Sequence, residues 1–179
     1  MARMLSGIDS VEQHLEQLRA DPEVYRPERC PHCGKAGLHQ HGQYVRNAPR
    51  GEGVAFSLES LLIPRFYCPA CQGTCSRLPA CLAPRRQYRW ATQQAVLERL
   101  MGGESRRTVA RRPGPGRRTL GRWWQWLTGH FAVHGFHLRS RFSELGRTGD
   151  WRAFWSACFQ RLGLGQAMVE LERAGVVVP

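Results

Sequence analysis

Two Cys-x-x-Cys pairs, Cys30/Cys33 and Cys68/Cys71, are the residues of this chain whose types and spacing point most directly to chemistry. Each pair puts two thiolates on one tight turn, and two such turns can complete a tetrahedral metal site. Gly34 follows the first pair, and a glycine there lets the backbone turn so that N–H groups point at the sulfurs. The pattern predicts a structural Zn²⁺ site of four cysteines, on which folding of a small module depends.

Two disulfides or free thiols are the alternative interpretation of these pairs. A Cys-x-x-Cys disulfide is typical of thioredoxin-like redox proteins, but neither pair is surrounded by the βαβ pattern of that class. The seven cysteines are an odd number, and four of them have zinc spacing, which suits a reducing compartment. Zinc ligation is therefore the preferred prediction.

Other candidate metal ligands have simpler interpretations. Cys75 lies four residues after Cys71 and could take its place, although it reads more simply as a small buried side chain, as do Cys81 and Cys158. Two sets of histidines have a spacing that could place them on one face: His39 with His41 along a predicted strand, and His130 with His134 and His137 if a helix forms despite Gly129 and Gly135. No carboxylate accompanies the second set, so metal binding at either is the lesser expectation.

The charge of the chain points to a polyanionic partner. There are 26 basic residues against 14 acidic ones, a net charge of +12, and all but one of the basic residues are arginine. Arginine makes forked contacts to phosphates and to guanine edges, so this balance favours nucleic acid over a membrane. We find no apolar run of about 20 residues and no secretory signal at the amino end. We expect a cytoplasmic protein that associates with nucleic acid.

The cysteine pairs must be positioned by the elements of residues 1–84. Residues 8–20 are predicted to form a helix that is capped by Asp9 or Ser10 and ends at Asp21 and Pro22. Residues 38–46 and 55–67 are rich in β-type residues, with turn material at 47–53 between them. We therefore expect a zinc ribbon with an inserted β-hairpin, whose second strand leads into Cys68.

Residues 85–130 are predicted to form a second, helical module that carries most of the charge. Eleven arginines and two glutamates lie between positions 85 and 122, which is +9 of the net +12. We expect three helices. The first covers residues 91–101, the second begins after a cap at Glu104 or Ser105, and the third covers residues 117–127. In the last of these, one face carries the apolar stripe Leu120, Trp123, Trp124 and Leu127, and the other carries Arg118, Arg122 and Gln125.

This arrangement is typical of a helix-turn-helix, in which the third helix enters the major groove of duplex DNA. Arginine and glutamine can make bidentate contacts to bases. The residues expected at the groove are Arg117, Arg118, Thr119, Arg122 and Gln125; those expected at phosphates are Arg85, Arg86, Arg106, Arg107, Arg111 and Arg112. An ordinary helical core with a basic surface is the alternative, and the turn at 113–116 (Pro-Gly-Pro-Gly) departs from the usual pattern.

Residues 131–179 are predicted to be a helical extension that packs on the second module or on a partner. An apolar stripe begins after the predicted cap Asp150 and consists of Trp151, Phe154, Trp155, Cys158, Phe159 and Leu162. It fits either a core or the face of a homodimer. The segment is too short, and has too few carboxylates, for a ribonuclease-H-like nuclease. We therefore expect no catalytic site and no enzymatic activity.

The order of these motifs resembles the front end of bacterial insertion-sequence transposases over residues 22–127. The motifs are Cys30–Gly34, Gly42–Arg46, Arg65–Cys71, Gly73–Pro79 with Tyr88, Gly103–Arg112 and Arg117–Trp123. Many such proteins read Thr-Phe-Ser where this chain has Thr74, Cys75 and Ser76. The chain is also similar to short transposon-linked proteins that carry only this front end.

The resemblance implies an α+β protein, with a zinc ribbon followed by a helix-turn-helix and a helical extension. It implies duplex-DNA binding in transposition, either at the ends of a mobile element or in regulation. Three alternatives stay open: the DNA-recognition subunit of a split transposase or nuclease with a separate catalytic chain, a protein-recruiting adaptor, and an RNA binder.

Overall fold

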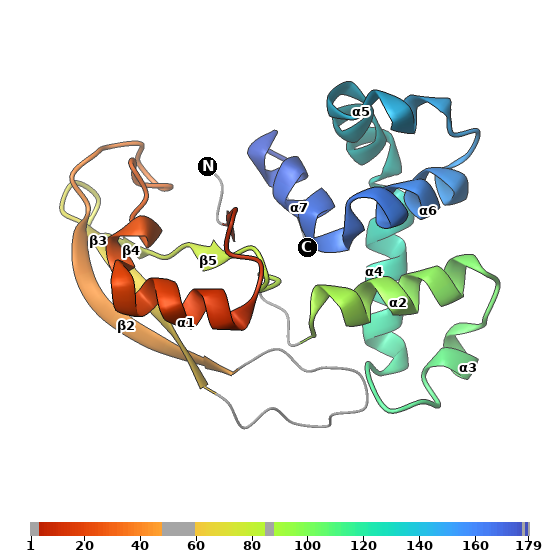
Figure 1. The fold of residues 1–179 in the computed structure, drawn as a ribbon, viewed down its shortest axis with the longest axis horizontal. Coiled ribbons are helices and arrows are strands. Elements are labelled where there is room, and N and C mark those ends of the chain that lie inside the picture. Colours follow the sequence, from red (N-terminus) through yellow and green to blue (C-terminus); the bar gives the residue numbers. More distant parts are fainter. Residues whose placement is uncertain (1–3, 48–59, 85–87, 177, 179) are drawn as a thin grey trace.

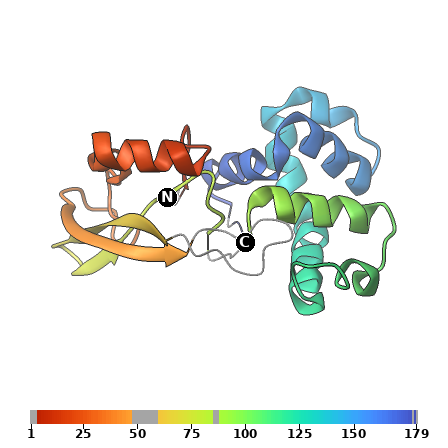
Figure 2. The same cartoon turned by 60° about the horizontal axis from the view of Figure 1, so that its bottom comes forward.

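The structure is a computed structural model (Figure 1). It describes residues 4–47, 60–84, 88–176 and 178. It confirms the α+β class: within these residues there are seven α-helices and two small sheets. The sheets and the first helix form one part of the molecule, and the other six helices form the second (Figure 1). Helix α7 (Gly163–Arg173) lies on the side of the helical part that faces the sheets (Figures 1 and 2).

The amino-terminal helix has the predicted place and cap. After strand β1 (Met4–Leu5), helix α1 spans Val11–Ala20, and the Ser10 side chain accepts a hydrogen bond from the Gln13 backbone N–H at 3.1 Å. The Gln13 side chain in turn accepts from the Ser10 N–H, which completes a capping box. The short 3₁₀ helix η1 (Pro22–Tyr25) follows directly, because Asp21 ends one helix and caps the next.

The predicted β-hairpin is present. Strands β2 (His39–Asn47) and β3 (Ser60–Cys68) pair in antiparallel register, and β4 (Gly73–Cys75) adds a third strand next to β3. The second predicted strand begins at Ser60 in the described residues, since positions 48–59, with most of the predicted turn, lie outside them. A separate strand, β5 (Leu78–Pro79), pairs in parallel with β1. Strands β1, β4 and β5 are too short to be predicted from the sequence pattern.

A buried histidine fixes α1 to the sheet. His14 is completely buried, and its Nδ1 lies 2.6 Å from the Tyr25 hydroxyl while its Nε2 lies 3.1 Å from the backbone oxygen of Leu62. A neutral ring satisfies both contacts: Nε2–H donates to the carbonyl and Nδ1 accepts from the hydroxyl. Burial lowers the pKa of His14, which favours that neutral form.

The helical part contains the predicted helices and, in addition, α5 (Phe131–Arg141) and the 3₁₀ helix η2 (Ser143–Arg147). Its other elements are α2 (Trp90–Met101), α3 (Arg106–Val109), α4 (Arg117–Gly129), α6 (Trp151–Arg161) and α7. Helix α5 was not predicted as an element because Gly129 and Gly135 weaken a helix there. In the structure the ring of Phe131 covers Gly135, since a Cβ at position 135 would lie 3.2 Å from it.

One hydrophobic core joins the segments 85–130 and 131–179, which the sequence predicts as separate units. The stripe of α6 is part of this core: Phe154, Trp155, Cys158 and Phe159 are buried among α2, α4, α5 and α7. Only Trp151 and Leu162 are half-exposed. A homodimer through this helix stays a prediction, and it would have to use the few stripe residues that remain at the surface.

The two parts of the molecule are also connected. Met4, Ala80 and Ala83 belong to the same core as the helices, and the Trp90 indole N–H donates to the Ala80 carbonyl at 2.9 Å. The Met4 N–H donates to the Glu172 carboxylate at 2.6 Å. In the described part of the chain, no helix is long and apolar enough to cross a membrane.

Candidate metal centre and basic surface

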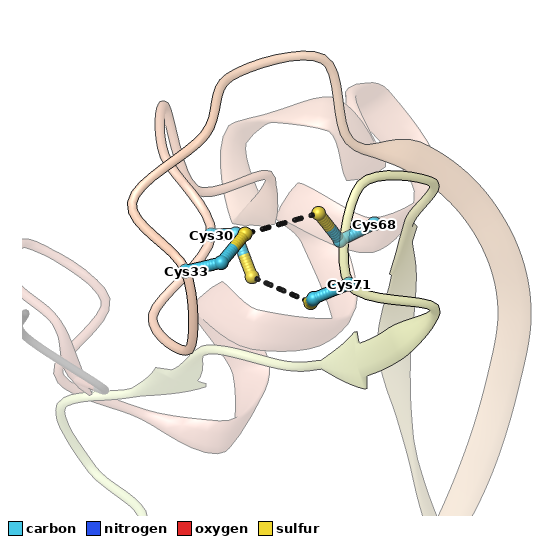
Figure 3. Close-up of side chains that lie close together, drawn as sticks. All are labelled: Cys30, Cys33, Cys68 and Cys71. Atoms are coloured by element: carbon cyan, nitrogen blue, oxygen red, sulfur yellow. Dashed lines mark hydrogen bonds between the residues drawn. The ribbon is translucent and has the colours of Figure 1, made fainter.

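Two turns bring the four cysteines together, as the sequence predicts. The first follows η1, where the Cys30 N–H donates to the Lys35 carbonyl and the Gly34 N–H donates to the Cys30 carbonyl. Gly34 has φ +74°, a backbone conformation that glycine adopts without strain. The second turn connects β3 to β4 and starts at Cys68. Figure 3 shows the four side chains converging from these two turns.

The spacing of the sulfurs fits a tetrahedral thiolate site. The Cys30 and Cys71 sulfurs lie 3.6 Å apart, those of Cys33 and Cys68 lie 3.7 Å apart, and all four lie within 4.8 Å of one another. Four sulfurs at about 2.3 Å from a central Zn²⁺ would be about 3.8 Å apart, whereas a disulfide brings its two sulfurs to about 2.05 Å. All seven cysteines are free thiols in the structure. The four can therefore hold a metal ion.

The backbone around Cys30 favours the thiolate. Burial alone would oppose ionisation, but N–H groups of Cys33 and His32, together with the neighbouring Cys71 and Cys68 thiols, lower the pKa of the Cys30 thiol to about 6. At Cys71 the Gly73 N–H acts in the same direction, but burial and the neighbouring thiols raise the pKa. The His32 N–H lies 3.4 Å from that sulfur. Thiolates are the form in which cysteines bind metals, so these donors prepare the site for a cation.

The other candidate ligands lie elsewhere or belong to the cores. Cys158 is completely buried, and burial raises the pKa of its thiol to about 12; this confirms it as a core residue. Cys75 and Cys81 are half-buried and pack against the small cores under the sheet. Among the described residues, only the four cysteines bring three or more ligand groups together, so neither set of histidines forms such a cluster.

The predicted recognition segment consists of three helices, α2, α3 and α4, that contact one another. Helix α3 is a single turn whose cap is Ser105: its hydroxyl accepts from the Thr108 N–H at 3.1 Å. It ends before Pro113, so that proline interrupts no helix. Gly116 precedes α4 as its N-cap, and Pro115 is buried beneath the turn. The Pro-Gly-Pro-Gly turn is thus a connector of defined shape.

Along α4 lies an open concavity of about 760 Å³ that is rich in arginine. The residues that line it are Arg106, Arg117, Arg118, Gly121, Arg122, Trp124, Gln125 and Thr128. Five of the predicted nucleic-acid contacts are therefore brought to one surface. None of the described residues that line it is acidic.

The remaining predicted contacts surround this concavity or lie apart from it. Thr119 is half-buried and accepts a hydrogen bond from Arg122 at 3.4 Å. Arg107 and Arg111 are exposed, and Arg112 pairs with Glu104 at 3.7 Å. Arg85 and Arg86 lie outside the described residues.

Three lining residues were not among the predicted contacts. Trp124 was expected in the buried stripe of α4, but only Leu120, Trp123 and Leu127 are buried, and Trp124 reaches the concavity while its ring edge meets Trp151. It lies at the boundary of the stripe, where spacing alone does not separate core from surface. Nothing in the sequence pattern indicated a contact for Thr128. For Gly121 the one indication was its unusual position inside a helix.

The fold and the site define an α+β protein with a four-cysteine candidate metal centre and an arginine-rich surface on a helical segment. Residues 30–123 match the family model described as a domain of unknown function, DUF6431, and the chain belongs to this family. The matched region starts at Cys30, the first candidate metal ligand, and ends within α4. No curated protein and no solved structure matches the chain.

Proposed function

We propose that this protein binds duplex DNA through α3 and α4 and is stabilised by Zn²⁺ at its four cysteines. The observation that carries the proposal is the concavity along α4, where four arginines from two helices line one surface without an acidic neighbour among the described lining residues. In a run of charged residues that is merely exposed to solvent, the charges normally include both signs or form ion pairs. An unpaired cationic concavity instead attracts a polyanion and speeds its association.

The positions of the side chains support docking of α4 against a groove. Arg118, Arg122 and Gln125 lie at spacings of four and three along the exposed side of α4, while Leu120, Trp123 and Leu127 hold the opposite side in the core. Arginine and glutamine can make bidentate contacts to guanine and adenine edges. Helix α3 lies beside α4 in the order of a helix-turn-helix, with Arg106 at its first residue.

Zinc is the metal that the ligand set supports best. Four thiolates at tetrahedral spacing select Zn²⁺ or an iron–sulfur centre over hard cations such as Mg²⁺. A bound Zn²⁺ would hold the two turns together and would supply no reaction, because all four positions would be protein ligands. The order of motifs that resembles transposase front ends supports a role at the ends of a mobile element or in its regulation.

The proposal is tested by selecting duplexes from a random pool and titrating the bound sequence at several salt concentrations. With about six phosphate contacts, the plot of log affinity against log salt should have a slope of about −5. The variant Arg118→Ala/Arg122→Ala should bind at least tenfold more weakly. The control Arg19→Ala/Arg147→Ala removes the same charge from exposed positions on α1 and η2 and should bind as the wild type does.

Two outcomes would count against duplex binding. A slope near zero would show that phosphates are not contacted. An equal loss of affinity in both double variants would show that net charge alone, and not the surface along α4, attracts DNA. Competition with duplex RNA of the same sequence separates an RNA binder from a DNA binder.

A further inference from the structure

The side chain of Arg106 from α3 lies across the middle of α4 at Gly121. A Cβ atom built at position 121 would come within 3.1 Å of the Arg106 Nη1, closer than most Cβ contacts in proteins. The guanidinium of Arg106 therefore lies where a side chain at position 121 would begin. Both residues line the concavity along α4.

The backbone offers no reason for a glycine at this position. Gly121 lies inside the 13-residue helix α4 and has no positive φ, so any residue could adopt its conformation. A glycine inside a helix costs about 1 kcal/mol relative to alanine. The contact with Arg106 is the one feature of the described surroundings that uses the missing side chain.

Position 121 also interrupts a row of polar side chains. Arg117, Gly121 and Gln125 follow one another at intervals of four and so form one ridge of the helix. The guanidinium of Arg106 fills the gap in this ridge, close to the helix backbone.

We propose that Gly121 is a positioning residue, which seats the Arg106 guanidinium in the centre of the nucleic-acid-binding surface. In this arrangement Arg106 contacts a DNA phosphate that the side chains of α4 do not reach, and the short helix α3 serves as its anchor. The proposal rests on the proposed function. On this proposal, a glycine that destabilises the helix is present at position 121 because it favours DNA binding.

The test is a double-mutant cycle of Gly121→Ala and Arg106→Ala, in which the melting temperature and the Kd for the selected duplex are both measured. Gly121→Ala should raise the melting temperature, because alanine favours the helix, and should weaken binding about threefold or more. Arg106→Ala should weaken binding about tenfold, as expected for the loss of one charge-assisted hydrogen bond. In the Arg106→Ala background, Gly121→Ala should then change Kd by less than about twofold.

Gly129→Ala is the matched control, since Gly129 ends the same helix and a Cβ there would meet nothing within 4 Å. It should leave Kd unchanged. The inference is overturned if Gly121→Ala leaves Kd unchanged, or if it costs the same with and without Arg106, which would mean that the methyl group obstructs the DNA directly. If the wild type binds no duplex, the proposed function falls as well; if it binds and the cycle is additive, only this inference falls.

Discussion

The sulfur atoms of Cys30 and Cys71 lie 3.6 Å apart although 41 positions separate the two residues in the chain. Two of the four thiols, Cys30 and Cys68, are also part of the small core that contains Tyr25, Leu38 and Phe66. The candidate metal centre and this core are therefore one structural unit. Without a bound ion, this small core alone would not offset the conformational entropy that the chain loses when the sheet folds.

We expect the purified protein to contain one Zn²⁺ per chain and the sheet part to unfold when a strong chelator removes it. Elemental analysis measures the metal, and circular dichroism with proteolysis measures the unfolding. Cys68→Ser should lose the metal because it removes one of four ligands. Cys75→Ser, at a half-buried cysteine outside the cluster, should keep it. Loss of metal in Cys75→Ser and its retention in Cys71→Ser would instead assign the fourth ligand to Cys75.

Replacing His14 should be costly, since it removes hydrogen bonds from the buried Tyr25 hydroxyl and from the part-buried Leu62 carbonyl. In His14→Leu, the Tyr25 hydroxyl and the Leu62 carbonyl both lose their hydrogen bond, and we expect a loss of about 2–4 kcal/mol in the free energy of unfolding. Urea denaturation measures this loss. Glu16→Ala, at an exposed position of the same helix, should stay within about 0.5 kcal/mol of the wild type. A wild-type stability in His14→Leu would mean that water satisfies these groups.

The helical part should lose stability as the pH is lowered, because of His134. This residue is completely buried and, within the described residues, neither ring nitrogen has a hydrogen-bond partner. Burial, followed by the charges of His130 and His137, lowers the pKa of His134 to about 4. Between pH 6.5 and 4 the unfolded chain takes up a proton that the folded chain refuses, so this site loses up to about 3 kcal/mol of stability as the pH falls.

The measurement compares denaturation midpoints at several pH values for the wild type and His134→Leu. The variant should lose less stability on acidification, by up to the same amount, because it has no proton to take up at this position. His39→Gln, at an exposed strand position, should follow the wild type. Parallel curves for the wild type and His134→Leu would show that the ring is protonated or hydrated in the folded state.

Two glutamates that contact arginines, Glu170 and Glu144, should differ in their importance for stability. Glu170 is 6% exposed and accepts from Arg141 at 2.6 Å and from Arg173 at 2.7 Å. Glu144 meets Arg161 at 3.1 Å in an exposed position. We expect Glu170→Gln to cost about 1.5–3 kcal/mol, because it weakens the charge-assisted hydrogen bonds of a buried carboxylate to two exposed arginines. Glu144→Gln should cost less than about 1 kcal/mol. Thermal denaturation checks both, and equal losses would contradict the role of burial.

The sequence predicts best those features that depend on neighbouring residues. The Ser10 cap, the Asp150 cap and the two cysteine turns follow local rules, and all are present in the structure. Helix α5 was missed because its glycines suppress the local signal, while the ring of Phe131 and the core restore it. The contact of His14 with Leu62 joins residues 48 positions apart, so no local pattern could reveal it.

The same distinction applies to the arginine-rich surface. The spacing of Arg118, Arg122 and Gln125 placed them correctly on one side of α4. Composition could not separate Arg106, which joins this surface, from Arg112, which pairs with Glu104. That difference depends on where the short helix α3 lies against α4, which is a matter of packing between helices.

The pairing of β1 with β5, together with the hydrogen bond from Met4 to Glu172, binds the first described residues to the last helix. Trimming the amino end past Leu5 would therefore expose the edge of β5 and leave the Glu172 carboxylate without its backbone donor. The same trimming would also weaken the end of α7, which lies near the other end of the sequence. Intact chains are thus the proper material for biophysical work on either half.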